Sequence, residues 1–398
     1  MILRFNDNST PWSYTGSPLK SEVVTLKQTE KGLYEKGFDD DLTPQELERM
    51  LSAFPREDSV TDLIFDRRRS NSFIDMKRGE LYPEVIGGVT RLRRVIARVY
   101  EVDMIQAQPN FSCNGCIDTF LSYIHHLELT DSRRNGFMVA TPTYFRYYHK
   151  IEALRMKLLD IPLGPNYEYP VDELLDHLKH KAPSCLFLVT PNNPTGLPIS
   201  DEHLLRILDR VPDDLNVAVD RTCANVDAEI STKTLLSRYP HKRIAVLHSF
   251  SKYYGMSHLR IGFTVFSNPV LAAEVDRYLP FGLGLEALLK ATYILLTRGE
   301  LKPDQRILSF IKRNRELMKE FLERHDDYNC SDFKSNYAVL TLPKRLGSHE
   351  FQKRLIQEGI LVMPGHELPV PDESSVRIHT GGPPEFMGRM LDLMDSWN

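Results

Sequence analysis

Lys252 lies in the stretch SFSKYYGMSHLRIGF, residues 249–263, directly after an apolar segment. That segment reads RIAVLHS at residues 243–249, a short apolar run that predicts a buried strand. The chain that leaves a buried strand of an α/β sheet often enters a ligand-binding crevice. Lys252 is therefore a candidate for a reactive amine at a sheet edge, rather than for a solvated surface charge.

Three further predicted strand or helix ends carry polar residues of types that bind ligands. GCID at 115–118 predicts the start of a helix, where backbone N–H groups bind anions and a glycine allows close approach. PNNPTG at 191–196 predicts a turn that leaves Asn193 facing the end of the preceding strand. VAVD at 217–220 places Asp220 at the end of a buried strand, where a carboxylate needs a cation or several donors. Each pattern alone is also typical of an ordinary turn or strand end.

The four ends together match the needs of one cofactor. A helix N-terminus binds a phosphate, an aspartate keeps a ring nitrogen protonated, an amide donates to a ring oxygen, and a lysine forms a Schiff base. Pyridoxal 5′-phosphate uses partners of all four kinds. The residues therefore predict a pyridoxal-phosphate site, and we expect no metal.

Short apolar strands alternate with amphipathic helices from about residue 84 to about residue 285. This order predicts an α/β fold with a mostly parallel central sheet and helices on both of its faces. One of the helices is expected at 89–100, and another is expected to open at Gly115. The expected strands are GFMVATP (136–142), MKLLDIP (156–162), CLFLVTP (185–191), LNVAVD (215–220), RIAVLHSF (243–250) and IGFTVF (261–266).

The length of 398 residues exceeds what one hydrophobic core usually serves, so we expect more than one domain. Long helices and short strands after about residue 285 predict a smaller α+β domain. We expect an N-terminal segment at 1–80, with a helical insertion, to pack with this small domain. The large cofactor-binding domain is then expected at 81–290 and the small C-terminal domain at 291–398.

Seven motifs occur in the order that a known family has. They are YP (82–83), NGCID (114–118), PTYFRY (142–147), PNNPTG (191–196), VAVD (217–220), SFSK (249–252) with Arg260, and VRIHTGG (376–382). With them the chain resembles the fold-type I pyridoxal-phosphate enzymes of the class I/II aminotransferase family, in the style of the histidinol-phosphate aminotransferase branch. The resemblance covers roughly residues 80–382.

The resemblance implies a role for each matching residue. Lys252 is similar to the Schiff-base lysine that also moves the proton, and Asp220 to the aspartate that keeps the pyridine nitrogen protonated. Asn193 matches the residue that donates to the ring oxygen beside the substrate, and Tyr144 the aromatic residue that stacks on the ring. The implied phosphate cradle consists of Gly115, Cys116, Ser249, Ser251 and Arg260.

Two further positions concern the partner subunit and the substrate. Tyr82 resembles the tyrosine that contacts the phosphate of the neighbouring subunit, so the resemblance implies a homodimer. Arg377 resembles the arginine that binds the α-carboxylate of the substrate, and a planar guanidinium suits a carboxylate better than an ammonium does.

One position departs from the family pattern. Family members commonly read Asp-x-Ala-Tyr, with the tyrosine donating to the ring oxygen, whereas this chain has Asp220-Arg221-Thr222-Cys223. The thiol of Cys223 lies at the cofactor-binding position but is a weak donor. The departure is close to the substrate side, so it bears on which reaction the site performs.

Transamination between an amino acid and a 2-oxo acid is the reaction that the whole motif set indicates. A second possibility is another pyridoxal-phosphate reaction on an amino acid: decarboxylation, elimination by a lyase, or cyclisation or oxidation in specialised metabolism. A third is a cofactor-binding regulator without catalysis, which the intact Lys252 disfavours. The residues alone leave the side chain of the substrate open.

The composition excludes several other classes. A formal net charge of −4 gives no reason to expect a nucleic-acid or anionic-membrane partner. The N-terminus lacks the apolar core of a signal peptide, and no apolar run approaches the ~20 residues that span a bilayer. Five cysteines make no disulfide framework, and Cys113 and Cys116 lack a second pair at zinc-site spacing. We expect reduced thiols and a cytoplasmic protein.

Overall fold

The computed structural model describes residue 45 and residues 89–130, 134–227, 229–280, 282–367 and 373–397. The predicted N-terminal segment at 1–80, apart from residue 45, and Tyr82 lie outside the described residues. The chain divides into two compact units, one of residues 1–99 with 281–299 and the other of residues 100–280 with 300–398. The first unit contains α12 (Leu285–Arg298) and all but the last residue of the predicted helix at 89–100, which is confirmed.

The second unit contains a seven-stranded sheet with the order β1-β7-β6-β5-β4-β2-β3. Strand β7 runs opposite to the other six strands, which share one direction, so the predicted α/β fold with a mostly parallel sheet is confirmed. The strands are β1 (Ala107–Asn110), β2 (Phe137–Thr141), β3 (Leu158–Pro162), β4 (Cys185–Val189), β5 (Asn216–Arg221), β6 (Arg243–Ser249) and β7 (Gly262–Phe266). All six predicted strands are present.

The edge strand β1 was not predicted. Its sequence, Ala-Gln-Pro-Asn, has no apolar pattern, yet all four residues are buried. Hydrogen bonds support this burial instead: Gln108 Nε2 donates to the Ala272 carbonyl (2.7 Å), and Asn110 Nδ2 donates to Thr119 Oγ1 (2.9 Å). Because buried polar groups need such partners, and these partners lie outside the strand, the sequence pattern alone did not indicate the strand.

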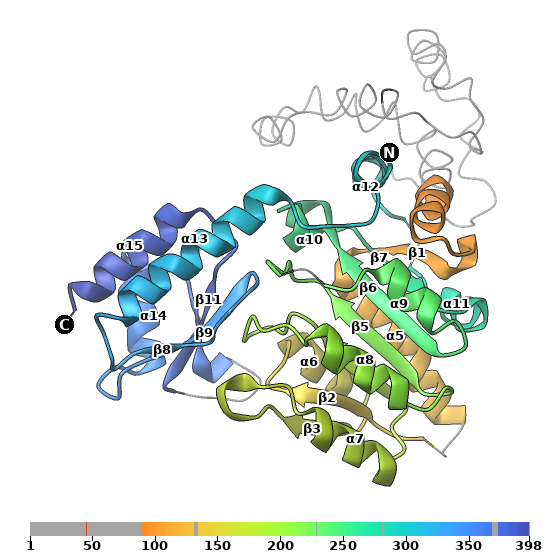
Figure 1. Ribbon diagram of the computed structural model, residues 1–398, viewed down its shortest axis with the longest axis horizontal. Coiled ribbons are helices and arrows are strands. Elements are labelled where there is room, and N and C mark those ends of the chain that lie inside the picture. The colour runs from red at the N-terminus through yellow and green to blue at the C-terminus, as the bar shows by residue number, and fades with distance from the viewer. Residues whose placement is uncertain are drawn as a thin grey trace, which may run out of the picture. The chain divides into compact units, whose positions relative to one another are not determined.

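Helices cover both faces of this sheet. In Figure 1, α7 (Val171–His180), α8 (Asp201–Arg210) and α9 (Thr232–Arg238) lie in front of it, and α5 (Ser112–Thr130) lies behind. The remaining helices of this part are α6 (Phe145–Ala153), α10 (Phe250–Tyr253) and α11 (Pro269–Asp276). Apolar side chains of α5, α6 and α11 form one core with Ala218 of β5. Since strand residues alternate between faces, Asp220 points toward the α5 side as Ala218 does.

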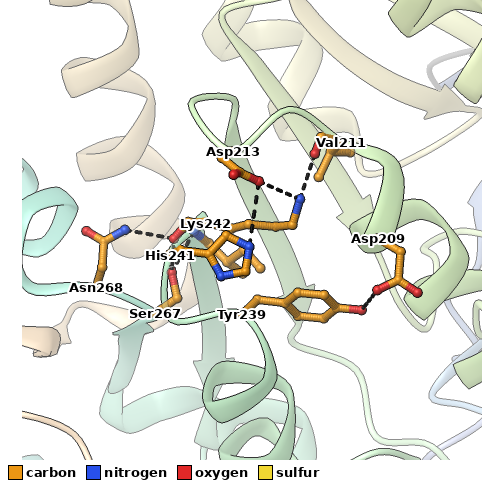
Figure 2. Close-up of polar contacts among 9 residues, drawn as sticks. Asp209, Val211, Asp213, Tyr239, His241, Lys242, Ser267 and Asn268 are labelled. Carbon is orange, nitrogen blue, oxygen red and sulfur yellow. Dashed lines mark hydrogen bonds and ion pairs between the residues drawn. The ribbon is translucent and has the colours of Figure 1, made fainter.

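The start of β6, the strand that leads to Lys252, is tied to the end of α8. Figure 2 shows that buried Lys242 donates from Nζ to the Val211 carbonyl (2.7 Å) and to Asp213 (2.9 Å). The Lys242 carbonyl accepts from Ser267 Oγ (2.5 Å) and Asn268 Nδ2 (2.7 Å), which follow β7. These bonds connect the start of β6 to the ends of β7 and α8, at the edge of the sheet opposite to Lys252.

A smaller antiparallel sheet of order β10-β11-β9-β8 follows in the same unit. Its strands are β8 (Asn329–Cys330), β9 (Tyr337–Thr341), β10 (Met363–Pro364) and β11 (Ser375–His379), and its helices are α13 (Gln305–Leu322), α14 (Ser348–Gln357) and α15 (Pro384–Asp395). Helices α13 and α15 lie side by side (Figure 1). In the register of β9 and β11, Arg377 lies opposite Val339 and His379 opposite Tyr337.

Among the helices that the structure describes, none is both long and apolar enough to cross a bilayer.

Candidate active site

Three of the predicted chemical groups follow neighbouring parallel strands. Strands β4, β5 and β6 are adjacent, and their carboxyl ends lead to the turn at 191–196, to Asp220 and to Lys252 in α10. The carboxyl ends of adjacent parallel strands meet at one edge of a sheet. Lys252 is half-buried there, and no described residue accepts a hydrogen bond from its amine. The centroid of the Tyr337 ring is 5.2 Å from Nζ.

Asp220 is 3% exposed, and its carboxylate accepts hydrogen bonds from several neighbours. Oδ1 accepts from the Thr222 backbone N–H (2.9 Å), the Thr222 hydroxyl (2.5 Å) and the Cys113 thiol (3.5 Å). Oδ2 accepts from the Tyr147 hydroxyl. Burial and the nearby Asp220 charge raise the pKa of Tyr147 well above its usual value, so this hydroxyl stays protonated and donates. One acceptor position of Oδ2 remains for a further donor.

The helix after β1 begins earlier than predicted, at Ser112 rather than at Gly115. The Gly115 N–H already donates to the Phe111 carbonyl (3.0 Å), so the N–H groups without an acceptor in the helix are those of Ser112, Cys113 and Asn114. Ser112, the first residue of this helix, adopts the αL conformation, with φ 57°. At Gly115 the packing excludes any side chain, because a Cβ atom would overlap Asn110 Oδ1.

The other predicted cradle residues lie around this helix start. Arg260 donates from Nη2 to Ser112 Oγ (2.6 Å). Gly262 pairs with both Asn110 and Ser249, and a Cβ there would overlap the backbone of Ser112 and His248, so the end of β6 and the start of α5 lie close together. Ser249 Oγ caps α10 by accepting from the Ser251 N–H (3.2 Å).

Ser251 has a hydroxyl oxygen that is buried and has no hydrogen-bond partner among the described residues. A buried hydroxyl without a partner is uncommon, and an anion beside it would supply one. Together with the Arg260 guanidinium and the free N–H groups of α5, the donor set fits a phosphate. Cys116, by contrast, is buried in α5, where burial raises the pKa of its thiol to about 12.

Tyr144 lies at the N-cap of α6 and donates its hydroxyl to Asn114 Oδ1 (3.1 Å). Its ring contacts that of Tyr147 edge-on, with 5.8 Å between centroids. The two tyrosines therefore line the site from α6, one turn apart. The PTYFRY motif contained Tyr147 as well as Tyr144, and the three-residue spacing was a signal that the sequence analysis did not use.

Arg377 comes to the site from the small sheet. Its Nη1 donates to Asn193 Oδ1 (3.2 Å), and its Cζ lies 4.7 Å from the centroid of the Tyr337 ring. Two hydrogen bonds hold the large and small sheets together here: the Lys334 N–H donates to the Gly196 carbonyl (2.9 Å), and Ser331 Oγ donates to the Thr195 carbonyl (2.6 Å). The structure thus brings Arg377 next to Asn193.

Cys223 is buried at the end of β5. Burial, followed by the Asp220 charge, raises the pKa of its thiol to about 12, although Lys252 and Arg377 act in the opposite direction. The thiol is therefore protonated at neutral pH and remains the weak donor that the sequence indicated.

Comparisons with known proteins agree with this arrangement. The family model described as aminotransferase class I and II matches residues 92–393. The histidinol-phosphate aminotransferase of Brevibacillus brevis is 27% identical over 305 residues, covering 75% of this chain and 78% of the relative. The structure of the histidinol-phosphate aminotransferase from Clostridium acetobutylicum has a TM-score of 0.65 at 16% identity, covering 82% of this chain and 93% of that one. The L-threonine-O-3-phosphate decarboxylase of Porphyromonas gingivalis has a TM-score of 0.64 at 19% identity, covering 78% and 88%.

Replacing Tyr147 by Phe should destabilise the protein, because Asp220 Oδ2 then loses its donor. A hydrogen bond to a charged group contributes about 1.5–3 kcal/mol, and we expect a loss of this size in urea unfolding of the cofactor-free protein. Tyr169→Phe is the matched control, since its hydroxyl is buried with no partner among the described residues. It should change stability little, and equal losses in both variants would contradict the assigned contact.

Proposed function

This chain belongs to the class I and II aminotransferase family, and we propose that its reaction takes place around Lys252, at the edge of the large sheet. It is a pyridoxal-phosphate-dependent aminotransferase, and its substrates are amino acids and oxo acids. The observation that supports this location is the arrangement of the 191–196 turn, Asp220 and Lys252 at the ends of three adjacent strands.

Pyridoxal 5′-phosphate, when bound, supplies an aldehyde that condenses with amines and a ring that withdraws electrons from the Cα of the substrate. We propose that the start of α5, Ser249, Ser251 and Arg260 bind its phosphate. The buried, unpartnered hydroxyl of Ser251 supports this, as does the hydrogen bond from Arg260 to Ser112. Tyr144, one turn before Tyr147 on α6, would cover one face of the ring.

Asp220 and Asn193 would bind the edge of the ring. The free acceptor position on Asp220 Oδ2 suits a protonated ring nitrogen, and a buried carboxylate stabilises such a charge. Asn193 accepts from Arg377 through Oδ1, which leaves its Nδ2 to donate to a ring oxygen. Cys223 takes the place of the usual tyrosine, so Asn193 would be the stronger donor of the two.

Lys252 would bind the cofactor covalently and move the proton. Because no described residue donates a hydrogen bond to Nζ, its lone pair is available once the amine is deprotonated. We propose that Nζ takes the proton from the substrate Cα and returns it to the carbon of the cofactor's aldehyde group, since a positioned amine is an effective acid–base group.

Arg377 would bind the α-carboxylate of the substrate. Of its five N–H donors, one is used by Asn193, and the others have no acceptor among the described residues. A guanidinium with a free edge binds a carboxylate through two parallel hydrogen bonds, which also orients the substrate.

A second candidate is decarboxylation on the same residues. It is supported by the likeness to the L-threonine-O-3-phosphate decarboxylase in fold and by Cys223, which departs from the family pattern beside the ring. Transamination is the better supported of the two, since the family match covers residues 92–393 and the curated relatives are named as aminotransferases.

Dependence on an acceptor separates the two reactions. Cofactor-loaded enzyme is mixed with each of the common L-amino acids, first without and then with 2-oxoglutarate or pyruvate. A transaminase should release one 2-oxo acid per site and stop, because the amino group stays on the enzyme, and should resume when the acceptor is added. Repeated turnover without an acceptor, with release of carbon dioxide, would contradict transamination.

We further propose a cytoplasmic homodimer in which Tyr82 contacts the partner's cofactor site. The five free cysteines fit a reducing compartment, and the implied role of Tyr82 requires a second subunit. Size-exclusion chromatography of the cytoplasmic fraction of the source cells should find the protein at twice the 45.9 kDa of one chain. Recovery from another fraction, or at the mass of a monomer, would contradict this proposal.

A further inference from the structure

The ring of Tyr337 contacts two cations of the site at once. Lys252 Nζ lies 5.2 Å from the ring centroid and Arg377 Cζ lies 4.7 Å from it. Both distances are within the ~6 Å at which a cation is attracted to an aromatic ring. His379 contacts the same ring edge-on, with 5.6 Å between the ring centroids. No motif in the sequence analysis included Tyr337.

The register of the small sheet explains how the ring and the guanidinium meet. Tyr337 of β9 lies opposite His379 of β11, and Arg377 is two residues before His379 on the same face. Tyr337 and Arg377 are therefore diagonal neighbours, a spacing that aromatic and long side chains span. The backbone of Tyr337 is closely packed as well, because a Cβ at Gly196 would overlap its carbonyl oxygen.

The residue directly before the ring connects the same strand to the lysine. Buried Asn336 accepts from the Ala224 N–H through Oδ1 (2.7 Å), and its Nδ2 donates to the Lys252 carbonyl (3.5 Å). The start of β9 thus contacts Lys252 at two points. The side chain of Asn336 contacts the backbone carbonyl of Lys252, and the ring of Tyr337 contacts its amine. This gives the ring a defined place between the large sheet and Arg377.

We propose that Tyr337 is a positioning residue of the transamination reaction, which sets the spacing between Arg377 and Lys252 through its ring. The inference rests on the proposed function. The face of an aromatic ring attracts cations, and among the described residues the Arg377 guanidinium makes one hydrogen bond, to Asn193. With the guanidinium held by the ring, a carboxylate bound to Arg377 would have its Cα at a constant place relative to Nζ.

The ring and the hydroxyl of Tyr337 can be separated by substitution. Tyr337→Phe keeps the ring and should leave KM for the amino acid within about twofold of the wild type. Tyr337→Leu removes the ring and should raise that KM about 2- to 30-fold, the range that a cation–ring contact covers, with a smaller change in kcat. The probe is the L-amino acid that gives the fastest acceptor-dependent turnover in the wild type.

A control variant accounts for general damage to the strand. Leu340→Ala truncates a buried side chain of β9 and should lower stability while leaving KM unchanged. If Tyr337→Leu does not fold, Tyr337→Met takes its place. A KM in the Phe variant as high as in the Leu variant would assign the effect to the hydroxyl and overturn the inference, as would a Leu variant with the KM of the wild type.

A second readout needs neither cofactor nor substrate. Crystal structures of the cofactor-free Phe and Leu variants should retain the hydrogen bond from Arg377 to Asn193 in the first and lose it in the second. An unmoved Arg377 in the Leu variant would overturn the inference. A wild type without transamination in any assay would instead refute the proposed function, whereas the crystal comparison still tests the placement of Arg377.

Discussion

The carboxylate of Asp220 is the buried charge on which the rest of the site depends. Moving a carboxylate from water into a protein interior is costly unless donors surround it. The donors here come from three places: the residues directly after β5, the start of α5, and α6. Satisfying this one group therefore joins α5 and α6 to the end of the central strand. Other contacts, the hydrogen bond from Arg260 to Ser112 and the close approach at Gly262, bring the start of α5 with its free N–H groups next to Arg260 and the end of β6.

The small sheet is connected to that edge by hydrogen bonds of the backbone and of side-chain amides, and not by apolar packing alone. Gly196 accommodates the Tyr337 carbonyl, and Asn336 bonds to both Ala224 and Lys252. Because these bonds are directional, they define where β9 and β11 lie against the large sheet. Arg377 then meets Asn193, so the residues that we assign to the substrate and to the cofactor contact each other directly.

Much of this architecture could be predicted from periodicity. The six apolar strands all form, because short apolar runs between amphipathic helices have few alternatives. Strand β1 was missed because its burial depends on hydrogen bonds such as that from Gln108 to Ala272, and the early start of α5 was missed because it begins at an αL residue, Ser112. Tyr337 was missed because its two cationic partners are distant in sequence. Arg377 is its diagonal neighbour on β11, and Lys252 follows a strand of the large sheet. The role of Tyr82 stays a prediction.

The claim that Lys252 carries the cofactor can be tested most directly by trapping the covalent link. The pyridoxal-phosphate-loaded protein is reduced with sodium borohydride, digested, and analysed by mass spectrometry for a lysine that bears the reduced cofactor. We predict one modified lysine, Lys252, and no modified peptide from the Lys252→Ala variant. Stoichiometric modification of any other lysine, with Lys252 unmodified, would contradict the account.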